Sequence, residues 1–253
     1  MEFFDCNASY GVFSVAPHKR ADTVDDLVKE MEWCGVQRAM VRHAAMLDES
    51  PIVGNPLLIE QIEGHENLVP SWTMLPPQTR ELGTVEQLIS AMKDNGVKAL
   101  WAYPSKHKYL LNGTTFGELF EEMIARNIPL FIERGENSGG LVGWAMAESV
   151  LKDFPKLTLA VVGHGSWGED RYFRPMIEKY ENMYVDTSRY ELDGGIADFC
   201  KTYGPSRMLF GTNFPKTPMG GPMLTLMHAD ITDDEKAAIG SGNLQRVLSE
   251  VKL

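Results

Sequence analysis

The sequence predicts an α/β fold, a single (β/α)₈ TIM barrel. Short strand-like runs alternate with helical stretches eight times along the chain, an order that favours parallel strands joined by crossover helices. Eight such units in 253 residues is the usual size of a closed barrel. An open, doubly wound sheet would usually show a glycine-rich fingerprint after its first strand, and the stretch NASYG is not one. We therefore expect one domain over residues 1–253, without a linker.

Each predicted unit begins with a run rich in β-branched or aromatic residues, which favour strands. These runs are residues 3–8, 38–44, 68–75, 98–104, 128–135, 157–165, 182–188 and 207–215. The helices that follow them are predicted at residues 23–35, 56–65, 84–96, 115–127, 142–154, 171–180, 196–204 and 233–248. Thr23 and Thr84 are suitable N-caps for two of these helices, and Gly35 and Gly96 are suitable stops.

Composition limits the possible classes of function. Hydrophobic residues make up 43% of the chain, enough for a sizeable core, and the formal net charge is −11 without a basic cluster. Nucleic acid is therefore not an expected partner. Three scattered cysteines argue against a disulfide framework or a thiolate zinc site. No long apolar run and no basic-then-apolar N-terminal segment appears, so we expect a cytoplasmic protein without membrane contact. A homodimer is left open.

Polar and aromatic residues gather where the predicted strands end, which is where barrels of this kind place their functional groups. On the first strand, Asp5, Asn7 and Ser9 are spaced two apart and should share the inner face. The residues that end the other strands are His43, Trp72, Trp101, Tyr103, Glu133, His164, Asp186, Ser188 and Asn213. Aromatic walls with a few polar groups are typical of a small-molecule site, and we expect a small-molecule partner.

Several of these residues have an equally ordinary structural explanation. Asp5 suits a deep structural carboxylate, and Asp186 could orient His164 or bond the backbone at its strand end. Trp101 could line a pocket or fill a core layer. Arg189 could hold a substrate carboxylate or lie on the surface. Pattern alone leaves these alternatives open.

The chain resembles the amidohydrolase superfamily, in the branch related to aminocarboxymuconate semialdehyde decarboxylase and small lactonases. The resemblance spans nearly the whole chain. It is carried by the stretches FFDCNAS, GVKALWAYP, IPLFIERG, LAVVGHGSW, RMLFGTNFP and GSGNLQRVL. In that family the first strand reads Asp-x-His-x-His, and its two histidines bind a divalent metal with help from a histidine on strand five or six. An aspartate on strand eight completes the pattern.

This sequence departs from the family pattern at most of those positions. The resemblance places Asn7 and Ser9 at the two first-strand histidines, Glu133 at the strand-five histidine and Asn213 at the strand-eight aspartate. Of the family's residues, His164 on strand six is kept. A catalytic zinc needs about three His, carboxylate or thiolate ligands. We therefore expect no preformed zinc site and no cofactor.

The leading hypothesis is a metal-independent enzyme acting on a small polar, carboxylated molecule by hydrolysis of a lactone or amide, or by decarboxylation. Glu133 and His164 would share the acid and base roles, with Asp186 beside them. The residues expected to bind substrate are Asn7, Ser9, His43, Trp101, Tyr103, Arg189 and Asn213. Two alternatives stay open. One is a non-catalytic ligand- or partner-binding barrel, and the other is a metal-dependent hydrolase using Asp5, Glu133 and His164.

Overall fold

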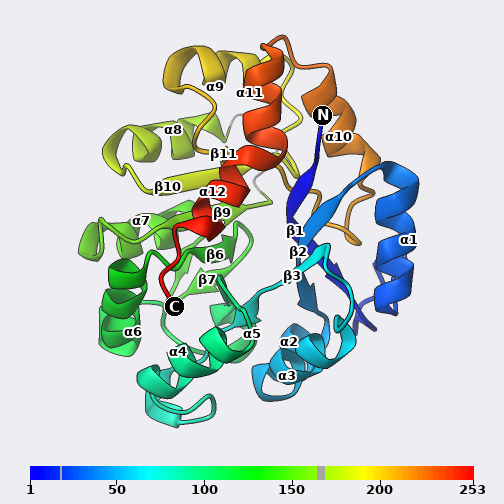
Figure 1. Cartoon of the computed structure of the whole chain (residues 1–253). Coiled ribbons are helices and arrows are strands. Elements are labelled where there is room, and N and C mark those ends of the chain that lie inside the picture. The colour runs from blue at the N-terminus through cyan, green and yellow to red at the C-terminus, as the bar shows by residue number, and fades with distance from the viewer. Residues whose placement is uncertain (18, 164–168) are drawn as a thin grey trace.

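The strands close into the α/β barrel that the sequence predicts. The computed structural model describes residues 1–17, 19–163 and 169–253. One parallel sheet consists of β1 (Phe4–Tyr10), β2 (Arg38–His43) and β3 (Leu68–Pro70). The other consists of β4 (Trp72–Thr73), β5 (Leu100–Ala102), β6 (Leu130–Glu133), β9 (Leu159–Val162), β10 (Met183–Asp186) and β11 (Met208–Leu209). Figure 1 shows the helices arranged around these strands.

Two seams join the sheets into a ring. The third predicted strand divides at Ser71, so that β3 pairs with β2 while β4 pairs with β5. At the other seam the segment after β11 runs beside β1: the Cys6 amide donates to the Phe210 carbonyl at 2.9 Å, and the Ser9 amide donates to the Phe214 carbonyl at 2.9 Å. Closure in this way leaves no exposed sheet edge at either seam of the described barrel.

The principal helices follow the strands in the predicted order. They are α1 (Val24–Cys34), α3 (Pro51–Gln61), α4 (Val85–Asp94), α6 (Gly113–Arg126), α7 (Trp144–Asp153), α8 (Asp170–Lys179), α9 (Gly195–Tyr203) and α12 (Asn243–Ser249). Shorter elements lie between them: α2 (Ala45–Asp48), η1 (Pro77–Thr79), α5 (Pro104–His107), the hairpin of β7 (Asn137–Ser138) and β8 (Leu141–Val142), α10 (Gly220–Met227), α11 (Asp233–Ala237) and η2 (Ala238–Gly242).

Local sequence explains where the first helix begins and ends. The Thr23 hydroxyl accepts a hydrogen bond from the Asp26 amide, and the Asp26 carboxylate accepts one from the Thr23 amide. This reciprocal capping box satisfies two amides that the helix leaves unpaired. Gly35 ends the helix in the left-handed conformation, with φ of 79°, which glycine adopts without steric cost.

Two predicted helices differ from the structure. The second was predicted at residues 56–65, but α3 begins at Pro51 after the cap Ser50, and Pro56 lies inside it. The reason is that Pro51 occupies the first turn, where its missing amide costs nothing. The C-terminal stretch predicted at 233–248 is helical throughout, but residues Ala238–Gly242 form a π-helical segment, η2, between α11 and α12. Gly240 approaches the segment before β1 so closely there that a Cβ would lie 2.8 Å from the Glu2 carbonyl oxygen.

A bulge in β1 overturns the expected alternation on that strand. The pairing of β1 with β2 shifts register between Asp5 and Ala8. Phe4 and Cys6 pack in the barrel interior, whereas Ala8 and Tyr10 pack in the outer layer between strands and helices. A bulge inserts an extra residue and so reverses the alternation beyond it. Asp5, Asn7 and Ser9 therefore do not climb one inner face as predicted.

The two ends of the barrel differ in chemistry. At the end where the strands begin, the apolar side chains Leu244, Val247 and Leu248 of α12 join the interior cluster that contains Phe4. Figure 1 shows α12 lying across the strands. The opposite end, where the strands finish, carries buried polar and charged groups. The barrel therefore has an apolar floor and a polar mouth.

We predict that Gly211→Ala lowers the free energy of unfolding by about 1–3 kcal/mol, because overpacking forces neighbours to move. A Cβ at this position would lie 2.4 Å from Asp186 Oδ2 and 3.1 Å from Cys6 Sγ. Gly220→Ala is the matched control, since no atom lies within 4 Å of a Cβ built there. Urea unfolding of both variants measures the difference. Equal stabilities would show that the space beside Gly211 is not tight.

Candidate active site

A buried arginine lies at the centre of the barrel mouth. Arg42 is on β2, and only 3% of its side chain is exposed. Its guanidinium carbon lies 3.7 Å from the centroid of the Trp101 ring, which is a cation–π contact. Trp101 in turn stacks on Phe131 at 5.0 Å and donates from Nε1 to the Ser71 hydroxyl at 3.0 Å. The guanidinium thus stacks on the Trp101 ring, which Phe131 and Ser71 hold in place.

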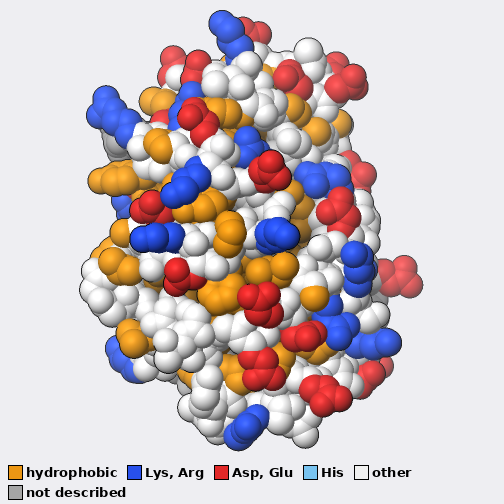
Figure 2. All heavy atoms as spheres, turned by 90° about the vertical axis from the view of Figure 1, so that its left-hand side faces the viewer, with side chains coloured by type: hydrophobic (Ala, Val, Ile, Leu, Met, Phe, Trp, Pro, Cys, Tyr) orange, Lys and Arg blue, Asp and Glu red, His pale blue; other side chains and the backbone are white. Residues whose placement is uncertain are grey.

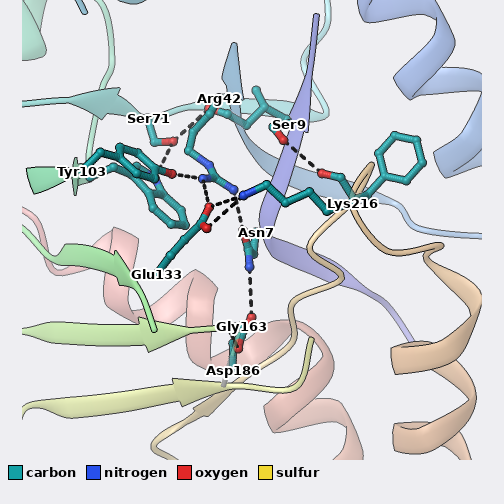
Figure 3. A network of polar contacts seen from close by, with 12 residues as sticks. Asn7, Ser9, Arg42, Ser71, Tyr103, Glu133, Gly163, Asp186 and Lys216 are labelled. Atoms are coloured by element: carbon teal, nitrogen blue, oxygen red, sulfur yellow. Dashed lines mark hydrogen bonds and ion pairs between the residues drawn. The ribbon is translucent and has the colours of Figure 1, made fainter. Parts of the chain in front are cut away.

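Side chains from β1, from β6 and from the residue directly after β5 surround this guanidinium. Nη1 donates to the Tyr103 hydroxyl and, at 3.3 Å, to Glu133 Oε1, while Nη2 donates to Asn7 Oδ1. Figure 3 shows these side chains converging on Arg42. Nε is buried and has no hydrogen-bond partner among the described residues. A buried charge costs several kcal/mol unless it is paired, so these partners are what make its burial tolerable.

A second cation shares the carboxylate of Glu133. Lys216, on the segment after β11, places Nζ 3.0 Å from Oε1 and 2.9 Å from Oε2. Burial alone would raise the pKa of Glu133, but the charges and hydrogen bonds of Lys216 and Arg42 outweigh burial and lower that pKa below its ordinary value. Glu133 is therefore a carboxylate at neutral pH, held between two positive charges.

Asn7 links this cluster to β10. While its Oδ1 accepts from Arg42, its Nδ2 donates to Asp186 Oδ2 at 3.3 Å. Asp186 Oδ1 accepts from the Gly163 amide at 2.9 Å (Figure 3). The side chain of Asn7 therefore spans the mouth from a guanidinium to a carboxylate. An amide suits this position because it accepts on one side and donates on the other.

Asp5 belongs to the barrel seam rather than to this cluster. Its Oδ1 accepts from the amides of Asn7 at 2.8 Å and Thr212 at 2.9 Å, and the Thr212 hydroxyl donates to Oδ2. Burial raises the pKa of Asp5 to about 6 from 3.8, in spite of these hydrogen bonds. The carboxyl group fastens β1 to the segment after β11.

The structure brings together some of the predicted site residues and not others. Asn7, Tyr103, Glu133 and Asp186 belong to the Arg42 network, and Trp101 lies beneath it. His164 lies outside the described residues. The remaining predicted binding residues have other contacts, described next.

Four residues predicted to bind substrate are engaged elsewhere. The Ser9 hydroxyl donates to the Phe214 carbonyl at 3.1 Å. His43 Nδ1 accepts from the Ala45 amide at 3.1 Å, and burial lowers the pKa of this imidazole. Arg189 is exposed, with Nε 4.0 Å from Glu191. Asn213 adopts φ of 58°, a left-handed conformation for which asparagine is favoured.

Sequence reasoning missed Arg42, and it did not pair Lys216 with Glu133. His43 was chosen as the functional end of β2, but Met40 packs inward and alternation then turns Arg42, not His43, into the barrel. An arginine two residues after an inward methionine was the available signal. Lys216 lies in the irregular segment after β11, where no periodicity indicates direction. Its approach to Glu133 follows only from the fold.

A divalent metal ion does not fit the donor set that the structure describes. Within residues 1–17, 19–163 and 169–253, no three His, Cys, Asp or Glu side chains are grouped as ligands. Both oxygens of Glu133 already face Lys216, and Asn7 Oδ1 faces Arg42. Asp5 and Glu133 contact different partners, so the alternative ligand set built on them is not assembled among these residues. Two resident positive charges would also repel a dication.

A separate cavity of about 820 Å³ lies beside the barrel, between the β7–β8 hairpin and helices α7 and α8. Arg134, Trp144, Glu169 and Tyr172 are among its lining residues, whereas Arg42, Glu133 and Lys216 are not. Figure 2 looks onto the left side of Figure 1, where α6 to α9 lie, and shows hydrophobic side chains there interspersed with charges of both signs. Among the described helices, none is both long enough and apolar enough to cross a bilayer.

A family model for amidohydrolases matches residues 12–249. The chain therefore belongs to this amidohydrolase family, and it is an enzyme, as the sequence predicts. A search of curated proteins gave no match.

Solved structures with the same barrel share little sequence with this chain. A TIM-barrel protein from Bordetella bronchiseptica is 19% identical, with a TM-score of 0.76 and coverage of 99% of both chains. A 2,6-dihydroxybenzoate decarboxylase from Rhizobium is 15% identical, with a TM-score of 0.72 and coverage of 98% of both chains. A dihydroxybenzoic acid decarboxylase from Polaromonas, with bound manganese and 2-nitroresorcinol, is 15% identical, with a TM-score of 0.74 and coverage of 98% of this chain and 97% of that one. At such identities these likenesses establish the fold.

We predict that Asp5 makes the protein less stable as pH rises from about 4 to about 7. The folded state holds this proton more tightly than the unfolded chain, so the contribution is complete below pH 3.8 and is lost as pH rises through about 6. The free energy of unfolding of the wild type, minus that of Asp5→Asn, should fall over this interval by on the order of 3 kcal/mol.

Asp26→Asn is the matched control, because the contribution of Asp26 to stability should change with pH in the opposite direction. The hydrogen bond from Thr23 lowers the pKa of the exposed Asp26, so its contribution is lost as pH falls. Urea unfolding at a series of pH values measures both differences. A flat wild-type-minus-Asp5→Asn difference would contradict the assignment of a raised pKa to Asp5.

Proposed function

We propose that this enzyme hydrolyses or decarboxylates a small carboxylated aromatic molecule, and that Arg42 and Lys216 bind the negatively charged oxygen of its substrate without a metal ion. The observation that carries the proposal is the buried guanidinium of Arg42, stacked on Trp101 at the mouth of the barrel. A guanidinium suits planar oxyanions and aromatic neighbours. The aromatic acids bound or transformed by the structurally similar decarboxylases agree with this class of substrate.

The two cations are most useful where negative charge develops during the reaction. In hydrolysis, this is the carbonyl oxygen of the lactone or amide under attack. In decarboxylation, the charge of the departing carboxylate passes to the rest of the molecule, so a cation on the carboxylate itself would stabilise the ground state. The carboxylate can pair with Arg42 and Lys216 when the substrate binds, but the barrier falls only when these cations contact the oxygen that receives the charge, such as an ortho hydroxyl oxygen.

Glu133 and His164 are the proposed proton-transfer groups. Glu133 is ionised at neutral pH and can accept a proton, although Lys216 and Arg42 lower its pKa and make it a weak base. In hydrolysis it would take a proton from the attacking water. His164 is the proposed acid on sequence grounds: in decarboxylation it would deliver a proton to the ring carbon, which loses the carboxylate as CO₂. Asp186, through Asn7, would hold the cluster in place.

The proposal is tested by assaying purified protein with 2,6-dihydroxybenzoate, 5-carboxyvanillate and a phenyl lactone, with CO₂ release and ring absorbance as the measurements. We expect turnover of a carboxylated aromatic compound. Folded protein that transforms none of these classes would refute the proposed function.

We predict that Arg42→Met lowers kcat/KM by about 10²-fold or more, because an oriented cation at a developing charge is lost. Arg38→Met is the matched control: its guanidinium also lies over a ring, that of Phe4 at 4.2 Å, but at the other end of β2. Arg38→Met should leave kcat/KM within about threefold of wild type. Circular dichroism verifies the fold, and Arg42→Lys provides a milder change if Arg42→Met unfolds. Full activity in a folded Arg42 variant would remove this residue from the mechanism.

We predict that activity survives exhaustive chelation and that added zinc or manganese does not raise kcat. The positive charge of the mouth comes from side chains, which a chelator cannot remove. Elemental analysis of the purified protein accompanies the assay. One equivalent of bound metal, whose removal abolishes activity and whose return restores it, would contradict metal independence.

A further inference from the structure

The carboxylate of Glu133 lies where an anionic ligand would meet both cations of the mouth. It makes two contacts of 2.9–3.0 Å with Lys216 and one of 3.3 Å with Arg42. Figure 3 shows the three charged groups meeting at one point. An external carboxylate that approached Arg42 and Lys216 would need the same positions. The protein thus carries its own competitor for the anion site.

Burial divides this cluster into a fixed part and an exchangeable part. Arg42 is held on four sides, by Trp101, Tyr103, Asn7 and Glu133, and is 3% exposed. Lys216 is 43% exposed and Glu133 is 20% exposed, so their ion pair is partly in solvent. Solvent-exposed ion pairs contribute little, about 1 kcal/mol or less. The Glu133–Lys216 contact is therefore the one that a ligand can replace at small cost.

Arg42 also has unused capacity to donate. Its Nε is buried and has no partner among the described residues, and a buried donor left unsatisfied is unfavourable. Glu133 in its present position does not satisfy this donor. In the free protein, the Glu133 carboxylate is thus shared between Arg42 and Lys216, and one donor of Arg42 stays without a hydrogen bond among the described residues.

We propose that Glu133 is an internal counter-ion that an incoming carboxylate or other planar oxyanion displaces from Lys216, so that Arg42 and Lys216 form the anion site only when this exchange occurs. Glu133 stays beside Arg42 and moves away from the ligand. The exchange rests on the anion-binding part of the proposed function. It adds a reason why the site would select anionic ligands over neutral ones. Neutral molecules of the same shape do not supply the charge that Lys216 requires.

The exchange predicts that one substitution in the site strengthens the binding of an anion instead of weakening it. Glu133→Gln removes the competitor and leaves both cations, so it should tighten binding of benzoate by about tenfold. A residue that merely contacted the ligand would weaken binding when altered. Titration calorimetry with benzoate, and with benzamide as the neutral analogue, measures both affinities. Benzamide affinity should not change.

Three further variants make the result specific. Asp48→Asn also removes an acid paired with a lysine, Lys106 at 3.2 Å, and should leave benzoate affinity unchanged. Glu133→Asp keeps the charge on a shorter side chain and should give an intermediate gain; it serves if Glu133→Gln unfolds. Adding Lys216→Gln to Glu133→Gln should abolish the gain.

Unchanged or weaker benzoate binding in folded Glu133 variants would overturn the exchange, as would failure of both wild type and variants to bind benzoate. An equal gain in Asp48→Asn would show a general effect of net charge and would overturn it too. Benzoate binding requires no turnover. The exchange can therefore fail while the proposed reaction is found, and it can hold while no reaction is found.

Discussion

The burial of one guanidinium governs the arrangement of the barrel mouth. Arg42 carries a full charge in a site that is 3% exposed, and such burial is tolerated only when opposite charge and acceptors surround it. Glu133 on β6, Asn7 on β1 and Tyr103 directly after β5 supply them, and Trp101 supplies an aromatic face. The polar residues at these strand ends are therefore parts of one electrostatic unit.

In the proposed function, this unit takes the place that a divalent metal ion has in the family pattern. The family resemblance leads to a mouth where histidines hold a dication, but here Asn7 contacts Arg42 and Glu133 contacts both Arg42 and Lys216. Positive charge is covalently part of the chain, so it needs no ligands and is not exchanged with solvent. A guanidinium and an ammonium also differ from a metal ion in chemistry: they orient and neutralise an oxyanion, but they do not convert bound water into hydroxide.

Much of the fold was predictable because its signals are local. Alternating strand and helix stretches indicated the barrel, and Thr23 with Gly35 marked both ends of α1. Glu133 was placed correctly at the mouth, because β6 is a regular strand of alternating faces. The predictions were wrong where a strand or helix departs from its regular geometry or begins at an unexpected cap. The bulge in β1 moved Asp5 out of line with Asn7, and the start of α3 depended on the cap Ser50 rather than on Pro56.

The sequence by itself determined the barrel, its polar mouth and the departure from the family's metal ligands, because each follows from residue type and spacing within one element. Only the tertiary structure decided which polar groups meet. Arg42 comes from β2, Glu133 from β6, and Lys216 from the segment after β11. The Arg42–Glu133 contact joins residues 91 positions apart and the Lys216–Glu133 contact joins residues 83 positions apart, and closure of the ring brings them together. Charge pairing depends on distance in space, which no pattern along the chain encodes.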